Sequence, residues 1–356
     1  MRIRRRLPLI LAVLLVIAAV ALAVVLRKHA PPEAARLLPG ADGFVYVNLG
    51  WMRRANLTGE LPQVPHDPDY EQFIQATGVQ FERDLDEVAL AIHYPATSSS
   101  TKTATAQPRY SEIFVGKFDG ERLRAYLRQI SSSVDSYQTR DIYNIPLEGR
   151  TLRVSILGVD TVAASNLDDS LIIRGIVQRS RKLASPFGGP ALLRQYYKEV
   201  PLASLGWSIF RIQPSTGLSV SGPVGWSFLF GSPATVVASV RYLGTVHFKA
   251  LAFTASDEEA NQVVARADTY LNLFRTAENT VPAPGADADL QAFFDSLKIQ
   301  AQKNRAVLSA AVPVGLIRKV LEAPASVALP VQPAENSPSA ESKSTTKKKK
   351  ATDKNR

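Results

Sequence analysis

The run from Leu7 to Leu26 constrains this chain more than any other feature. It contains twenty residues without a charge. At about 1.5 Å of rise per residue, a helix of that length spans the roughly 30 Å hydrocarbon core of a bilayer. Pro8 fits such a helix, because proline is tolerated in the first turn. The sequence therefore predicts a transmembrane helix close to the N-terminus.

A cleaved signal peptide is the alternative interpretation of this run. Ala21-Leu22-Ala23 has the small-x-small pattern of a cleavage site. Signal peptides usually have an apolar core of about 7–15 residues, whereas this run continues without a polar break to Leu26. We therefore favour an uncleaved signal-anchor within residues 1–28. The chain contains no cysteine, which excludes a lipoprotein anchor.

Basic residues flank the run unequally. Four arginines precede it, whereas Arg27 and Lys28 follow it. The more positive flank of a membrane helix tends to stay in the cytoplasm. We expect the N-terminus on the inner side of the cytoplasmic membrane and the main domain outside it. In this interpretation the lipid bilayer is the partner of residues 7–26.

The net charge of +10 does not describe the folded region. Residues 1–28 contribute +6 and residues 341–356 contribute +5, which leaves −1 for the rest of the chain. A nearly neutral domain gives no support to nucleic-acid binding. Residues 323–356 are rich in proline and serine and then in lysine, which predicts a disordered tail.

Between these ends the pattern predicts an α+β fold of antiparallel sheets and packed helices. Residues 29–36 contain a Pro-Pro pair, which favours an extended spacer. Helix starts are marked by the capping residues Asp119 and Asp168 or Asp169, and by a capping box of Ser256 with Glu259. Strands are expected at 44–47, 87–94, 111–118, 142–145, 151–157, 161–165, 206–212, 235–242, 245–254 and 305–312.

The order of these elements repeats along the chain. EVALAIHY and SEIFVGKF followed by a helix resemble TVVASVRY and TVHFKALAF followed by a helix. The pattern predicts two similar tandem lobes, 37–199 and 200–322, which either pack side by side or share one sheet. A chance similarity is the alternative, because α+β chains often produce such orders.

Three segments carry a resemblance to known proteins: LLPGADGFVYVNL, GKFDGERLRAYL and ILGVDTVAASN. With them the chain resembles a group of uncharacterised bacterial single-pass membrane proteins that have an extracytoplasmic α+β domain of unknown function. The resemblance covers most of residues 1–322 and rests on turns and strand starts. It implies no activity and no catalytic residues.

The sequence contains no recognisable catalytic motif. There is no nucleophile elbow, no P-loop and no dinucleotide-binding glycine pattern. His66 lies in an acidic loop but lacks metal-ligand spacing, and His93 and His247 lie in predicted strands where they are expected to pack or face water. We therefore predict no catalytic, cofactor-binding or metal-binding residues and no cofactor.

Two stretches are candidate contact sites. Trp226, Phe228 and Phe230 lie at alternate positions in an uncharged stretch, so a strand there would place three aromatics on one face. They are either a core strand or a surface that touches the membrane or a partner. The four lysines Lys347, Lys348, Lys349 and Lys350 either solvate the tail or contact an anionic surface.

These features favour a non-catalytic role in the cell envelope: binding, scaffolding or assembly. The expected partners are an envelope protein or an anionic polymer, in addition to the bilayer, and no nucleic acid. The alternative is a cell-envelope hydrolase whose active site the sequence does not reveal.

Overall fold

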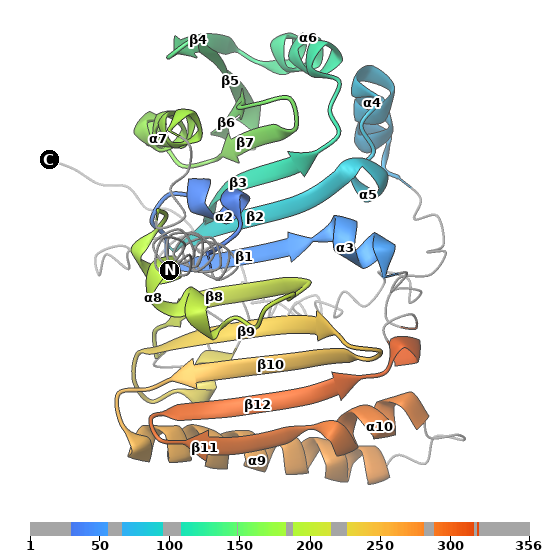
Figure 1. The fold of residues 1–356 in the computed structure, drawn as a ribbon, viewed down its shortest axis with the longest axis vertical. Helices are drawn as coiled ribbons and strands as arrows, with labels where there is room; N and C mark the ends of the chain where they lie inside the picture. Colours follow the sequence, from blue (N-terminus) through green and yellow to red (C-terminus); the bar gives the residue numbers. More distant parts are fainter. Residues whose placement is uncertain are drawn as a thin grey trace, which may run out of the picture.

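A computed structural model describes residues 30–55, 66–94, 108–147, 149–182, 188–214, 226–280, 288–316 and 319. In these ranges twelve strands form one sheet, in the order β11-β12-β10-β9-β8-β1-β2-β3-β7-β6-β5-β4 (Figure 1). Neighbouring strands are antiparallel throughout. The predicted α+β class with antiparallel strands and packed helices is confirmed.

In the described part of the chain up to Arg181 there are seven strands and six helices. Its strands are β1 (Gly43–Asn48), β2 (Leu85–His93), β3 (Arg109–Gly116), β4 (Ser133–Tyr137), β5 (Arg140–Leu147), β6 (Arg150–Ile156) and β7 (Thr161–Ser165). Its helices are α2 (Glu33–Leu37), α3 (Leu49–Arg54), α4 (Pro68–Thr77), α5 (Phe81–Asp84), α6 (Gly120–Ile130) and α7 (Ser170–Arg181).

The chain after Arg181 contributes the remaining five strands. After α8 (Ala191–Tyr196) and the 3-10 helix η1 (Tyr197–Glu199) come β8 (Gly206–Ile212), the 3-10 helix η2 (Trp226–Leu229), β9 (Ala234–Tyr242) and β10 (Val246–Phe253). The described chain ends with α9 (Asp257–Thr280), α10 (Ala288–Ser296), β11 (Lys298–Gln302) and β12 (Arg305–Val312).

The two halves meet where β1 pairs with β8. In this pair Tyr46 lies opposite Trp207 and Phe44 lies opposite Ile209. All four of these side chains are buried in one core cluster. Residues that are about 160 positions apart along the chain therefore join the halves into one continuous sheet, rather than two sheets packed side by side.

The same order of elements occurs on both sides of the β1–β8 pair (Figure 1). On one side β1, β2 and β3 are followed by α6, and the last strand of that half, β7, lies next to β3. On the other side β8, β9 and β10 are followed by α9 and α10, and the last strand, β12, lies next to β10. The first half also carries the hairpin β4–β5 at its outer edge.

Helices cover both faces of the sheet. On one face α2, α7 and α8 bury apolar side chains against the central strands. On the other face α6 packs on the strands of the first half and α9 on those of the second. Because successive residues of a strand point to opposite faces, Trp207 of β8 lies in the first layer and Phe210 in the second.

The expected extended spacer over residues 29–36 is wrong for its described part, because α2 begins at Glu33. Pro32 occupies the N-cap position, and the following Glu-Ala-Ala-Arg sequence has high helix propensity. Ala34 and Ala35 are buried in the central core cluster. The folded region therefore includes residues before Leu37.

The predicted anchor and tail lie outside the described residues. This applies to Leu7–Leu26 and to residues 323–356. Among the residues that the structure describes, no helix combines the length and apolar character needed to cross a bilayer.

Candidate functional site

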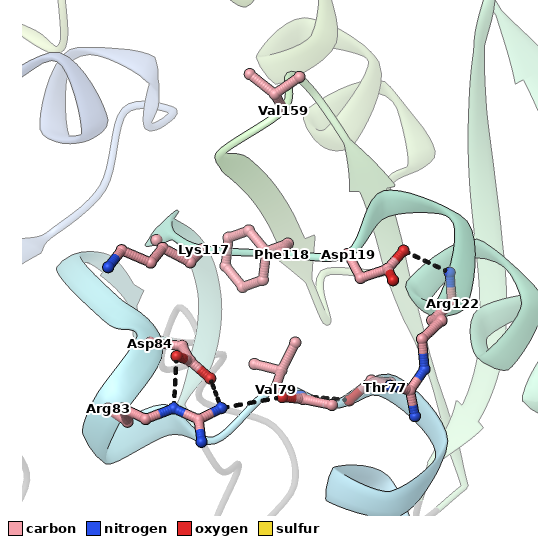
Figure 2. Close-up of a pocket in the computed structure, with 11 residues that line it drawn as sticks. Thr77, Val79, Arg83, Asp84, Lys117, Phe118, Asp119, Arg122 and Val159 are labelled. Carbon is pink, nitrogen blue, oxygen red and sulfur yellow. Dashed lines mark hydrogen bonds and ion pairs between the residues drawn. The ribbon is translucent and has the colours of Figure 1, made fainter.

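An open pocket of about 450 Å³ lies at one end of the strands of the first half. It is formed by the end of α4, by α5, by the end of β3, by the start of α6 and by the turn between β6 and β7. Figure 2 shows its lining side chains. We call it the Lys117 pocket; it is lined by Thr77, Gly78, Val79, Arg83, Asp84, Gly116, Lys117, Phe118, Asp119, Arg122 and Val159.

Two helix ends form one wall of the Lys117 pocket. Helix α4 stops at Gly78, which has a left-handed φ of 75° that suits glycine. Helix α6 starts at Asp119, whose Oδ1 accepts hydrogen bonds from the backbone N–H groups of Glu121 (3.0 Å) and Arg122 (3.1 Å). The Arg122 guanidinium donates to the carbonyls of Gln75 (2.6 Å) and Ala76, which ties the two helices together.

Arg83 and Asp84 form the opposite wall. The Arg83 guanidinium donates twice to the Asp84 carboxylate, from Nε at 2.9 Å and from an Nη at 2.7 Å. The Asp84 carboxylate also accepts from the backbone N–H of Gln80 at 2.9 Å. The hydrogen bonds from Arg83 hold the pKa of Asp84 below its ordinary value, so this carboxylate stays ionised.

Lys117 differs from the other charged residues of the pocket. No hydrogen bond or ion pair of its Nζ occurs among the described residues. Its backbone N–H donates to the Asp84 carbonyl at 2.9 Å, which fixes the start of the side chain at the pocket wall. In Figure 2 Arg83, Asp84 and Lys117 lie at the left of the view, and Asp119 and Arg122 lie at the right.

This arrangement is suited to binding an anion. Three cationic side chains line the pocket, against two carboxylates. Asp84 is neutralised by Arg83, and Asp119 caps a helix. The pocket lining includes no histidine and no serine. The lowered pKa of Asp84 does not suit a general acid, which needs a carboxyl group that stays protonated.

The structure places His66 in a small polar cluster. Its Nδ1 lies 2.9 Å from Glu71 and its Nε2 lies 3.3 Å from Glu82. The neighbouring Asp67 caps α4 by accepting from the Tyr70 backbone N–H at 2.8 Å. Within the described ranges, no group of three or more His, Cys, Asp or Glu side chains could hold a metal ion.

His93 and His247 lie in strands, as predicted from the sequence. His93 is at the end of β2, and burial lowers the pKa of its ring. His247 is on β10, where its Nε2 lies 3.0 Å from the Thr245 hydroxyl. Neither histidine belongs to the lining of the Lys117 pocket.

The predicted strand around the aromatic trio is wrong. Trp226–Leu229 forms the 3-10 helix η2, and Phe230 follows it. With about three residues per turn, such a helix does not place alternate residues on one face. Phe230 is buried in a core cluster with strands β8 and β9 and helix α9. Phe228 is half exposed and contacts the Tyr270 ring edge-on, with the ring centroids 4.7 Å apart.

Two members of the aromatic trio therefore differ in their exposure to solvent. Phe230 is a core residue, and Phe228 is available for a contact. Tyr270 and Leu273 of α9 are also exposed. The lysines Lys347–Lys350 lie outside the described residues.

Sequence reasoning did not single out the cationic residues of the Lys117 pocket. Lys117, Asp119 and Arg122 all lie in the GKFDGERLRAYL segment, which the sequence marks as a strand-to-helix junction. Arg83 lies far away in the sequence, in the short helix α5. Only the packing of α4 and α5 beside this junction brings the charges together, so no local pattern could reveal the pocket.

Comparisons with known proteins give little further information. No protein-family model and no curated protein matches the chain. Crystal forms IV, III and I of the protein TP0453 are similar at 10%, 11% and 12% sequence identity, with TM-scores of 0.40, 0.39 and 0.40. Each similarity covers 82% of this chain and 97% or 98% of the other. A likeness this weak carries no conclusion about function.

Proposed function

We propose that this chain is a membrane-anchored, extracytoplasmic protein with a non-catalytic binding role in the bacterial cell envelope. Its Lys117 pocket binds an anionic group of an envelope polymer or protein. The observation that carries the proposal is the Lys117 ammonium group. It lines an open pocket without an ion-pair partner in the described part of the chain, while the carboxylates of that pocket are already engaged.

The membrane location rests on the sequence. The Leu7–Leu26 run is long enough to span a bilayer, and the arginines before it favour a cytoplasmic N-terminus. A reporter that is active only outside the cytoplasm, fused to the C-terminus, is expected to be active. A silent reporter in an expressed fusion would reverse the orientation.

We also propose that the two halves arose by duplication, as the repeated order of strands and helices supports. Superposing residues 37–185 on 200–322 tests this. Matching paths of the three inner strands and of the following helix support duplication. Strands that match only in order, with different lengths and helix positions, favour chance.

The anion-binding proposal is tested with two polymers of different chemistry, inorganic polyphosphate and poly-L-glutamate. We expect the full-length chain to bind at least one of them in a salt-dependent manner. Lys117→Gln should weaken binding about three- to fivefold, because an exposed ionic contact contributes about 0.6–1 kcal/mol. Lys298→Gln is the matched control, since Lys298 is exposed on β11 at the other end of the sheet.

The lysine-rich tail is a second candidate for anion binding, so the assay must separate it from the pocket. Deleting residues 341–356 removes seven basic and two acidic residues. If the tail alone binds the polymer, this deletion abolishes binding and Lys117→Gln has no effect. That outcome would reject the pocket and retain a role for the tail.

The hydrolase alternative has no specific observation in its favour. In the Lys117 pocket the polar residues are engaged in helix capping, in an ion pair or in hydrogen bonds to backbone carbonyls, apart from Lys117. The binding function is therefore the one that we propose.

A further inference from the structure

A second, more enclosed cavity lies beside the β1–β8 junction. It has a volume of about 110 Å³, which is small compared with the about 300–1,000 Å³ of sites for drug-sized ligands. It therefore has room for one small group. Its lining combines aromatic rings with prolines and a turn: Pro32, Tyr46, Tyr197, Val200, Pro201, Leu202, Ala203, Ser204 and Trp207.

Three aromatic rings form two walls of this cavity. Tyr46 of β1 and Trp207 of β8 are stacked, with centroids 5.5 Å apart and planes 18° apart. Tyr197 of η1 meets Trp207 edge-on, with centroids 5.3 Å apart and planes 71° apart. The faces of such rings carry negative electrostatic potential, which attracts cations. A ring face that these contacts leave open to the cavity therefore favours a positively charged group.

The turn that closes the cavity has an unusual backbone. Ala203 has a φ of 57°, in the left-handed region that residues with a Cβ rarely adopt. The Ser204 hydroxyl donates to the Pro201 carbonyl at 2.7 Å and stabilises the turn. This hydrogen bond fixes the turn, whose residues line the same cavity as the aromatic rings.

A carboxylate without a cationic partner lies close to Tyr46 and Tyr197. Glu87 of β2 lies opposite Asn48, on the same face of the sheet as Tyr46 and outside the lining of the cavity. No ion pair of Glu87 with a lysine or an arginine occurs among the described residues. Burial raises the pKa of Glu87, and the nearby carboxylates of Asp86, Glu33 and Asp160 raise it further. Asp86 is already paired with Arg53 at 2.7 Å, whereas a cation bound in the neighbouring cavity would stabilise the ionised form of Glu87.

One residue of the cavity wall also carries an unused hydrogen-bond donor. Trp207 is only 4% exposed, and its Nε1–H has no acceptor in the described part of the protein. A buried donor without an acceptor is unfavourable and rare. Because Trp207 lines the cavity, an oxygen atom of a bound ligand can serve as this acceptor.

From these observations we propose that this cavity binds the ammonium group of a small amino alcohol, against the Tyr46, Tyr197 and Trp207 rings that line it and within electrostatic reach of Glu87. The amino alcohol is either free or the headgroup of a lipid. This site is separate from the Lys117 pocket, so the failure of either proposal leaves the other intact.

The test uses the full-length chain in a detergent without ammonium groups, with choline and ethanolamine as probes. Calorimetry or Trp fluorescence is expected to show saturable binding of at least one of them. The neutral isostere 3,3-dimethyl-1-butanol has the shape of choline without its charge, and it should bind at least tenfold more weakly. Equal affinity for the neutral compound would overturn the proposal, because apolar filling alone would then explain binding.

Variants of the walls make the test specific. Tyr197→Ala should weaken binding about five- to tenfold, as expected for the loss of one cation–π contact, whereas Tyr197→Phe retains the ring and should bind. Tyr196→Ala is the matched control, because Tyr196 is the neighbouring residue and contacts Phe253 outside the cavity. Glu87→Gln preserves side-chain size and should also weaken binding. It provides the test if Tyr197→Ala does not fold.

Lipid composition distinguishes the two sources of the ligand. The chain is reconstituted in phosphatidylglycerol bilayers with or without phosphatidylethanolamine. If the headgroup occupies the cavity, phosphatidylethanolamine lowers the apparent affinity for ethanolamine; if the free compound is the ligand, affinity is unchanged. Absence of binding by the wild-type chain, or wild-type affinity in both Tyr197→Ala and Glu87→Gln, overturns the proposal.

Discussion

Tyr46 and Trp207 lie opposite each other across the β1–β8 pair, with their rings stacked and their centroids 5.5 Å apart. Tyr46 comes from the first half of the chain and Trp207 from the second. Both side chains are at least 95% buried in the cluster that also holds α2, α7 and α8. This ring pair is therefore a direct packing contact between the two halves.

Trp207→Ala is expected to lower the free energy of unfolding by about 3–5 kcal/mol, as for other large buried aromatic residues. Because β1 and β8 join the halves, we expect one cooperative urea transition at a lower midpoint. Trp51→Ala is the control, since Trp51 is 54% exposed and its replacement should change stability by about 0.5 kcal/mol or less. Two separate transitions in the wild-type chain would show that the junction does not couple the halves.

The two phenylalanines of the aromatic stretch should respond differently to truncation. Phe230→Ala removes a core side chain of the second half and should cost about 3–5 kcal/mol. Phe228→Ala removes one edge-on contact with Tyr270 at a half-exposed position and should cost about 1 kcal/mol. Urea denaturation measures both. Comparable losses would mean that Phe228 is also part of the core, and would argue against a contact surface there.

Local patterns predicted much of this fold. The expected strand 206–212 coincides with β8, and the strand 161–165 coincides with β7. The predicted Ser256 cap at the start of α9 is present, since its hydroxyl accepts from the Glu259 N–H; the Glu259 carboxylate accepts from the N–H of Ala255, one residue before the cap. Such features depend on a few adjacent residues, so the sequence alone is sufficient to predict them.

Elements with weak local signals were not predicted. Strand β4 (Ser133–Tyr137) is mostly exposed and lies at the sheet edge, so it lacks an apolar alternation. Its hairpin turn places Gln138 and Thr139 at positive φ, where Asn-Gly or Gly is the usual signal. Strand β11 is likewise at an edge and is followed by Lys303 at positive φ. The pairing of β1 with β8 depends on tertiary packing and has no local signal.

Glu112→Gln should change how stability depends on pH. Glu112 lies on β3 between Leu90 of β2 and Ala164 of β7, and burial raises the pKa of its carboxyl above the ordinary 4.5. A raised acidic pKa means that the folded state holds the proton more tightly than the unfolded state. The resulting stability is present below about pH 4.5 and is lost as the pH rises through the folded-state pKa.

The variant is therefore expected to match the wild-type protein in free energy of unfolding near pH 4. At pH 8 it should be more stable, by on the order of 1 kcal/mol, because no charge needs to be buried. Denaturant unfolding across this pH range measures the difference. Parallel stability curves for the two proteins would mean that Glu112 has a cationic partner or full access to water.

Asp119→Asn should separate the structural and electrostatic effects of a single side chain in the Lys117 pocket. Asn is as good an N-cap as Asp, so α6 should retain its stability within a few tenths of a kcal/mol. The substitution removes a negative charge from the pocket lining, so polyphosphate should bind about two- to threefold more tightly, in keeping with an exposed charge effect below about 1 kcal/mol.

The matched variant Asp119→Ala removes the same charge and also the cap. The N–H groups of Glu121 and Arg122 then lose their acceptor, which should cost about 1 kcal/mol of stability. Both variants should show the same gain in anion affinity if charge alone is responsible. Unchanged or weaker polyphosphate binding in both would contradict the assignment, because removing a negative charge from the lining of an anion-binding pocket should strengthen anion binding.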